Sequence, residues 1–215
     1  MDELAGWKAA FNLSDTFGGL ESTRAFARRT DAGFYQHYAR SDSGRVGMDV
    51  GCSYDCLFLP HLPESEVWGW DESHGDAHDL EEIPDGALDF VYSSHLFEHM
   101  EDPERALRSQ ARVVKPSGHI ILVLPHRDYY ERRTELPSRY NDDHKRFYLP
   151  FEQDPPVTVS VFGFVSETLS DIGRDWRWID LSTELDGTTN WRSPQLHANG
   201  LFNIVATVRL GEPHG

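Results

Sequence analysis

Short apolar runs alternate with longer amphipathic stretches through the middle of this chain. The runs are predicted as strands at about 46–50, 66–70, 88–93 and 119–124. The stretch before the last of them, EDPERALRSQARVV, is the clearest predicted helix, because Asp102 suits an N-cap and Pro103 suits the first helical position. Apolar strands that alternate with helices are typical of parallel sheets with both faces covered. The pattern therefore predicts an α/β fold with a doubly wound, mostly parallel sheet.

The two ends of the chain have different patterns. The first 45 residues show mostly helical spacing of aromatic positions, whereas the last third holds a helix, GFVSETLSDIG, and two alternating segments at about 177–186 and 201–209. Two alternating segments with a polar connection predict an antiparallel hairpin. We therefore expect a single domain with an N-terminal helical cap at 1–45, a core at 46–126, a lid or acceptor-loop insertion at 127–156, and a C-terminal helix and hairpin at 157–215.

Composition narrows the choice of partners. The chain has 20 basic and 36 acidic residues and a net charge of −16, so it repels nucleic acid and anionic membranes, and neither is expected to bind. The acidic N-terminus lacks the pattern of a signal peptide, and the longest apolar run, IILVL, is too short to span a bilayer. We therefore expect a cytoplasmic protein in which Cys52 and Cys56 are reduced thiols.

The ends of the first two predicted strands suggest a nucleotide-type ligand. Asp49-Val-Gly51-Cys-Ser53 lies where the first strand gives way to a helix, and a glycine there lets the backbone approach a ligand. Asp71 ends the next strand, about 20 residues further on, where an acidic residue commonly accepts the hydroxyls of an adenosine ribose. These residues favour a nucleoside-type cofactor. A plain strand-to-helix turn with a solvent-facing aspartate is the alternative.

Four further motifs carry a family resemblance, which spans about Val46 to His126. They are Gly75-Asp76-Ala77, Asp89-Phe90-Val91, LFEHMEDPERAL and VVKPSGHIILVLP. With the turn and Asp71, they closely resemble the class I S-adenosylmethionine-dependent methyltransferases, in particular the group in which methyltransferase domain type 11 is typical. The resemblance implies a Rossmann-like fold, S-adenosyl-L-methionine as the cofactor and S-adenosyl-L-homocysteine as the product.

The resemblance also assigns a cofactor site by position. The matching residues are Asp49, Gly51, Cys52, Ser53, Asp71, Asp76, Ala77, His78, Ser93 and His95. In the family, the residue that matches Asp71 binds the ribose, those that match Asp76 and Ala77 flank the adenine, and the segment that matches 93–95 lies beside the reactive methyl group.

Two departures from the family pattern affect these expectations. The family loop has three glycines, D-x-G-x-G-x-G, whereas Ser53 and Asp55 replace the second and third here. This change keeps open a catalytically silent protein that binds S-adenosylmethionine or S-adenosylhomocysteine. The connection between Asp71 and Asp76 is also too short for the usual helix and strand, so we expect a sheet that has lost or shortened an edge strand.

The predicted reaction is methyl transfer to a small-molecule acceptor with a hydroxyl, amine or carboxylate group. A hydroxyl acceptor benefits from a general base, and His126 and His144, which flank or belong to the insertion, are the candidates. The insertion is also rich in basic side chains, which favour an anionic or sugar-like acceptor: Arg127, Arg132, Arg133, Arg139, Lys145 and Arg146. A nicotinamide-dependent oxidoreductase is a further alternative, but it requires a G-x-G-x-x-G loop and a sheet that continues parallel.

One motif points to different chemistry. His95-Leu-Phe-Glu98-His99 matches H-x-x-E-H, the inverted zinc-peptidase motif, which needs both histidines on one stable helix. A new helix is predicted to start at Asp102-Pro103, which leaves barely one turn for the motif. We therefore expect no peptidase and no metal site, and we expect Glu98 to bind neighbouring backbone.

Overall fold

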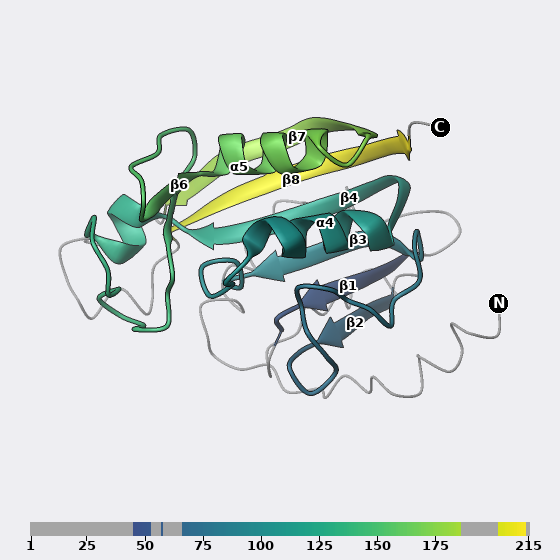
Figure 1. Cartoon of the computed structure of the whole chain (residues 1–215), viewed down its shortest axis with the longest axis horizontal. Helices are drawn as coiled ribbons and strands as arrows, with labels where there is room; N and C mark the ends of the chain where they lie inside the picture. The colour runs from purple at the N-terminus through teal and green to yellow at the C-terminus, as the bar shows by residue number, and fades with distance from the viewer. Residues whose placement is uncertain (1–44, 53–56, 58–65, 186–201, 214–215) are drawn as a thin grey trace.

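The computed structural model of the chain describes residues 45–52, 57, 66–185 and 202–213. Apart from Arg45, the predicted helical cap lies outside the described residues, and so do Ser53 and Asp55 of the loop. Six of the described strands form a sheet in the order β2-β1-β3-β4-β8-β7 (Figure 1). Their bounds are β1 Val46–Val50, β2 Glu66–Trp70, β3 Leu88–Ser94, β4 Val114–Pro125, β7 Arg174–Leu185 and β8 Phe202–Pro213.

Strand directions in this sheet confirm the predicted mixed architecture. β1, β2, β3 and β4 run parallel, whereas β8 runs antiparallel to both of its neighbours, β4 and β7. The final described strand is therefore antiparallel, which counts against the oxidoreductase alternative. Within the described residues β2 forms the edge of the sheet, as the short connection from Asp71 to Asp76 led us to expect.

The predicted central helix is present as α4, Pro103–Val113. The carboxylate of Asp102 accepts a hydrogen bond from the backbone N–H of Arg105 at 2.9 Å, and Pro103 occupies the first turn. The strand that follows starts earlier than predicted, at Val114. This buried residue pairs with Leu88 before a register shift, so residues 115–118, which precede the predicted strand, belong to an irregular start of β4.

The second described α-helix is α5, Val161–Ser170, whose N-cap Ser160 accepts a hydrogen bond from the N–H of Gly163 at 3.1 Å. α5 covers the same face of the sheet as α4 (Figure 1). The two helices and the sheet enclose one apolar core, in which Leu107 and Leu169 are fully buried. In the described part of the chain, no helix has the length and apolar character needed to cross a membrane.

The insertion predicted at 127–156 is an ordered part of the fold. It begins with η1, a single π-helical turn at Arg127–Glu131, and it contains β5, Phe147–Leu149. β5 pairs in parallel with β6, Thr158–Ser160, to form a second, two-stranded sheet. The segment lies beyond the carboxyl ends of the parallel strands (Figure 1). A cofactor site at that edge would therefore have the insertion on one side.

Candidate active site

The carboxyl ends of β1, β2 and β3 bring the predicted cofactor residues to one edge of the sheet. Asp49 is the fourth residue of β1, and Val50 beside it pairs with Trp70, the residue before Asp71. The backbone N–H of Gly51 donates to the carbonyl of Trp70 at 2.8 Å, so the glycine turn lies directly against the end of β2. In open α/β sheets this edge is where ligands bind.

Gly51 is required at its position for two reasons. Its φ of +82° lies in the left-handed region that side chains disfavour, and an added Cβ would lie 2.8 Å from the side chain of Leu96. The carboxylate of Asp49, which is buried, accepts a hydrogen bond from the N–H of Leu57 at 2.7 Å. Asp49 therefore binds the backbone of Leu57, a described residue beyond the glycine turn.

Cys52 corrects one expectation from the sequence. The residue is buried next to the glycine turn, and the structure records it as disulfide-bonded, whereas we expected reduced thiols. The other cysteine of the chain, Cys56, lies outside the described residues.

Asp71, the predicted ribose-binding acid, directly follows the end of β2. It is half-buried, and one carboxylate oxygen accepts the backbone N–H of Glu72 at 2.6 Å. Its own N–H donates to Nδ1 of His74 at 3.0 Å, which holds the start of the turn. The second carboxylate oxygen has no protein partner among the described residues, so it can accept hydrogen bonds from a ligand.

The Gly75-Asp76-Ala77-His78 segment forms a tight turn below the end of β2. Asp76 accepts the backbone N–H of His78 at 2.8 Å, and Nδ1 of the same histidine lies 2.7 Å from the carboxylate. These hydrogen bonds lower the pKa of Asp76. Nε2 of His78 accepts the N–H of Asp102 at 3.3 Å, which links the turn to the start of α4. Asp76 and His78 therefore stabilise the turn, while their predicted contacts with the cofactor stay a prediction.

His95 follows the end of β3 in a strained backbone conformation. Its φ is +53°, a conformation that costs a non-glycine residue about 1–2 kcal/mol. Its N–H donates to the carbonyl of Val123 at 2.9 Å, and its ring Nε2 lies 3.0 Å from Oδ1 of Asn203 on β8. The ring also contacts that of Tyr130 from the insertion, with 5.4 Å between centroids. His95 thus lies between the sheet edge and the insertion.

Ser93, two residues earlier, faces the protein interior. It is buried, and its Oγ accepts a hydrogen bond from the side-chain amide of Gln110 on α4 at 2.8 Å. The structure therefore gives Ser93 a role in joining β3 to α4.

The two predicted bases are both buried. His126 caps η1, where its Nδ1 accepts the N–H of Asp128 at 3.2 Å, and burial lowers its pKa. His144 lies 2.5 Å through Nδ1 from a carboxylate oxygen of Glu131. Burial opposes protonation of His144, but the hydrogen bond with Glu131 and the nearby carboxylates outweigh it, so its pKa is raised. The base role of these histidines stays a prediction, since neither is shown to reach an acceptor.

Most of the basic side chains in the insertion have protein partners. Arg127 pairs with Asp128 at 2.8 Å, and Lys145 pairs with Asp143 at 3.1 Å. Three further hydrogen bonds connect basic side chains of the insertion to backbone carbonyls. The guanidinium of Arg132 donates to the carbonyl of Tyr129 at 3.1 Å, and that of Arg146 donates to the carbonyls of Met100 and Glu101 at 2.9 and 3.1 Å. These residues anchor the insertion, so they lend little support to an anionic acceptor.

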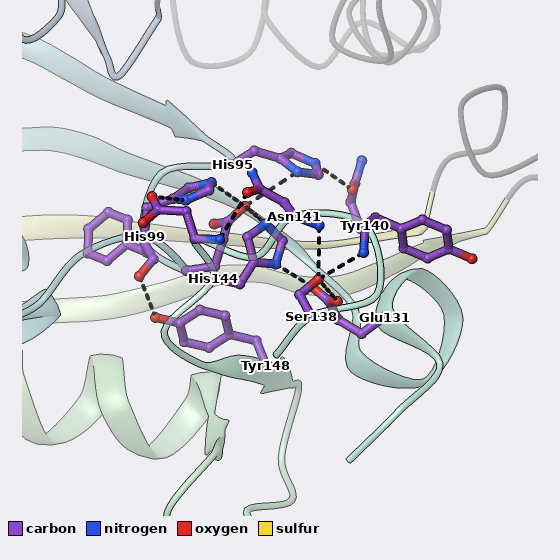
Figure 2. A network of polar contacts seen from close by, with 12 residues as sticks. His95, His99, Glu131, Ser138, Tyr140, Asn141, His144 and Tyr148 are labelled. Carbon is purple, nitrogen blue, oxygen red and sulfur yellow. Dashed lines mark hydrogen bonds and ion pairs between the residues drawn. The ribbon is translucent and has the colours of Figure 1, made fainter. Parts of the chain in front are cut away.

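The most unusual group near the site is Glu98, whose carboxylate does not bind neighbouring backbone as expected. It is fully buried, and neither carboxylate oxygen has a hydrogen-bond partner among the described residues. Its Oε1 lies 3.5 Å from Nδ1 of His95, 3.9 Å from Nε2 of His99 and 4.0 Å from Nε2 of His144. Figure 2 shows the three histidines gathered in one network. Only the backbone of Glu98 binds neighbouring backbone, through its carbonyl and the N–H of Lys145 at 2.7 Å.

The H-x-x-E-H segment itself is a turn. Residues 95–100 contain no helix, so His95 and His99 do not share a helical face as a zinc peptidase requires. The residues that gather around Glu98 come from two separate segments of the sequence, HLFEH and DDHKRFY, and the second segment contributes His144. Neither segment contains a pattern that predicts contact between them in the folded protein.

Comparison with known proteins agrees with this architecture. Residues 48–122 match the methyltransferase domain family. The chain is 46% identical over 52 residues to ajmaline N-methyltransferase of Rauvolfia serpentina, a stretch that covers 24% of this chain and 17% of that enzyme. It is 27% identical over 128 residues to the ubiquinone biosynthesis O-methyltransferase of Pectobacterium atrosepticum, covering 53% of this chain and 51% of that one. The chain thus spans about half the length of this bacterial relative.

A solved structure shares the fold over nearly the whole chain. It is a S-adenosylmethionine-dependent methyltransferase from Archaeoglobus fulgidus, with a TM-score of 0.57, 18% sequence identity, and coverage of 88% of this chain and 94% of that one. The mixed sheet with its antiparallel C-terminal strand is the class I methyltransferase fold. Residues 48–122 are therefore similar to a methyltransferase domain, and the sheet has the fold of the S-adenosylmethionine-dependent methyltransferases.

Proposed function

We propose that this protein is an enzyme that transfers a methyl group from S-adenosylmethionine to a small-molecule acceptor. The observation that carries the proposal is the arrangement of Gly51 and Asp71 on adjacent parallel strands, within the matched region. Gly51 lets the chain turn at this edge with its N–H bound to the carbonyl of Trp70, and Asp71 directly follows Trp70. Asp71 has a carboxylate oxygen available there.

Each group at this edge has a definite task in such an enzyme. The cofactor supplies a methyl group on a cationic sulfur, which any well-placed nucleophile can accept. Asp71 accepts the ribose hydroxyls, and the turn held by Asp76 and His78 supports the adenine side. The protein contributes alignment of the acceptor and exclusion of water, and alignment alone can account for a large part of the rate.

For the acceptor we propose a hydroxyl or amine group on a small organic molecule. The names of the two relatives include an O-methyltransferase and an N-methyltransferase. His95 at the sheet edge and Tyr130 of the insertion have rings in contact, and together they offer polar and aromatic groups to such a molecule. We infer that these two side chains contact the acceptor.

Asp71→Ala is the substitution that tests the cofactor assignment. Each lost hydrogen bond to the carboxylate costs about 1.5–3 kcal/mol, so the affinity for S-adenosylhomocysteine should fall at least about tenfold. Isothermal titration calorimetry of the wild type and the variant measures this change. Glu82→Ala, which removes an exposed acid elsewhere, is the control and should bind like the wild type. Unchanged affinity in folded Asp71→Ala protein would refute the assignment.

A screen of hydroxyl and amine acceptors with labelled S-adenosylmethionine then tests the reaction. Transfer of label to one of these classes supports the proposed enzyme. Tight binding of both cofactor forms without transfer across the panel would favour the catalytically silent alternative.

A further inference from the structure

We propose that Glu98, His99 and His144 form a binding site for a divalent transition-metal ion, for which zinc is the best match. One ligand atom from each residue lies within 4.8 Å of the others. The site borders the predicted cofactor residue His95, whose Nδ1 lies 3.5 Å from Oε1 of Glu98, but the proposal does not depend on the proposed methyl transfer.

The distances between these atoms suit a small metal ion. Nε2 of His99 and Nε2 of His144 lie 3.9 and 4.0 Å from Oε1 of Glu98, too far apart for hydrogen bonds. Zinc binds imidazole nitrogen and carboxylate oxygen at about 2.0–2.2 Å, so neighbouring ligands of a tetrahedral zinc lie about 3.3–3.6 Å apart. Small side-chain rotations would bring the ligand atoms from their present separations to those of a tetrahedral zinc site. Two histidines and one glutamate also match the ligand set of zinc sites that leave the fourth position to water.

The buried carboxylate of Glu98 is the second observation that supports a metal site. Glu98 is fully buried without a hydrogen-bond partner for either oxygen in the described part of the chain, which is costly for an ionised group. A metal ion held by Glu98 and two imidazoles would compensate the charge. The buried carboxylate of Glu98 is therefore the expected anionic ligand of the metal ion.

The surrounding residues orient both histidines for this task. Nδ1 of His99 lies 3.0 Å from a carboxylate oxygen of Asp143, and Nδ1 of His144 lies 2.5 Å from one of Glu131. Each contact places a proton on Nδ1, so the lone pair on Nε2 faces Glu98. Metal-binding histidines almost always donate a hydrogen bond from the N–H of their other ring nitrogen to a carboxylate, a backbone carbonyl or water. The other oxygen of Glu131 accepts a hydrogen bond from Ser138 at 2.5 Å, which fixes the carboxylate.

The backbone brings the ligands together without the ion. The turn at 97–101 and the segment at 144–148 are joined by the N–H of Lys145 to the carbonyl of Glu98 at 2.7 Å, and by the hydroxyl of Tyr148 to the carbonyl of Phe97 at 3.2 Å. A metal ion here would fasten the insertion to the end of β3. This arrangement differs from that of the zinc peptidases, because His144 takes the place of His95 as the second histidine.

Metal binding by protein without a polyhistidine tag tests the proposal. We expect EDTA-treated wild type to bind one equivalent of Zn²⁺ in calorimetric titration, and one equivalent of Co²⁺ to produce the visible absorption of a tetrahedral site. His99→Ala and His144→Ala should each weaken Zn²⁺ binding by at least about 100-fold, since each removes a ligand. Asp143→Asn should weaken it by about 10–100-fold, because it removes an orienting partner.

His119→Gln is the matched control, because it removes a histidine on β4 that lies outside the cluster. It should bind Zn²⁺ like the wild type. Circular dichroism checks that each variant is folded. If His144→Ala does not fold, His99→Ala decides, since that side chain is partly exposed. Folded wild type that binds no Zn²⁺ or Co²⁺ more tightly than His99→Ala would overturn the proposal, and so would an equal loss in His119→Gln.

Discussion

The acidic residues of the sheet edge and those of the insertion differ in how the fold uses them. Asp71 is half-buried and keeps one oxygen available, and Asp76 is exposed and holds a turn. Glu131 of the insertion and Glu98 of the turn after β3 are fully buried, and a carboxylate oxygen of each lies close to a ring nitrogen of His144, at 2.5 and 4.0 Å. The sheet edge is therefore prepared for an external ligand, whereas the insertion is held by internal charges. The comparison predicts that loss of the half-buried carboxylate of Asp71 mainly weakens ligand binding, whereas loss of the buried carboxylate of Glu131 mainly lowers stability.

The largest expected effect concerns the reaction itself. If His126 or His144 is the general base, its replacement by alanine should lower turnover about 10²–10⁴-fold with little change in cofactor affinity. Rates with an identified hydroxyl acceptor and calorimetry with S-adenosylhomocysteine measure the two effects. His119→Ala provides the comparison for loss of a buried histidine outside this region. Full activity in both variants would mean that alignment alone carries the reaction.

Glu131→Ala tests whether the insertion depends on buried charge. The substitution leaves Nδ1 of His144 and Oγ of Ser138 without their partner, and removal of one member of a buried pair typically costs about 3–5 kcal/mol. Urea denaturation with EDTA present measures the free energy of unfolding apart from any metal. Glu135→Ala, an exposed acid in the same segment, should change it by less than about 0.5 kcal/mol. A similar small change for Glu131→Ala would show that the buried pair is not important for stability.

Alanine substitutions at two glycines can distinguish the cost of backbone strain from the cost of a steric clash. Gly51 and Gly86 both have positive φ, +82° and +60°, but an added Cβ would approach Leu96 closely only at Gly51. Gly86→Ala should cost about 1–2 kcal/mol for the left-handed conformation alone. Gly51→Ala should cost more, and it should also weaken binding of S-adenosylhomocysteine. Equal effects of the two substitutions on stability and binding would remove the special role of the glycine turn.

Asp76→Asn should have the smallest effect, and one that depends on pH. The pKa of Asp76 is lowered in the folded protein, so its contribution to stability is present above the ordinary aspartate pKa and is lost as the pH falls through the lower folded value. The variant should therefore be less stable than the wild type near pH 7, and the difference should shrink below about pH 4. Thermal unfolding across this range measures it, with Asp142→Asn as the charge-matched control. A constant difference at all pH values would contradict the prediction.

Local patterns in the sequence were sufficient for much of the fold. The bounds of β1 and β2 and the capping of α4 by Asp102 follow from short apolar runs and residue preferences, and the structure confirms them. The end of each parallel strand then places Gly51 and Asp71 together without further information.

The features that the sequence could not predict depend on distant partners. Val114 starts β4 early because it pairs with Leu88 across a register shift. Glu98 is buried against His144, and His144 is oriented by Glu131, through contacts that only the packing of the insertion creates. No spacing rule connects such residues, so HLFEH could be judged only as an isolated motif.

The position of β8 has a consequence for how the site is assembled during folding. Because β8 runs opposite to β4, its first residues arrive at the edge where the parallel strands finish, and Asn203 there meets Nε2 of His95. β8 lies between β4 and β7 and pairs with a strand far earlier in the chain, a contact of the slow-forming, non-local kind. The glycine turn and Asp71 need only β1 and β2. The ribose side of the site can therefore form early, whereas His95 acquires its Asn203 partner only when the last described strand docks.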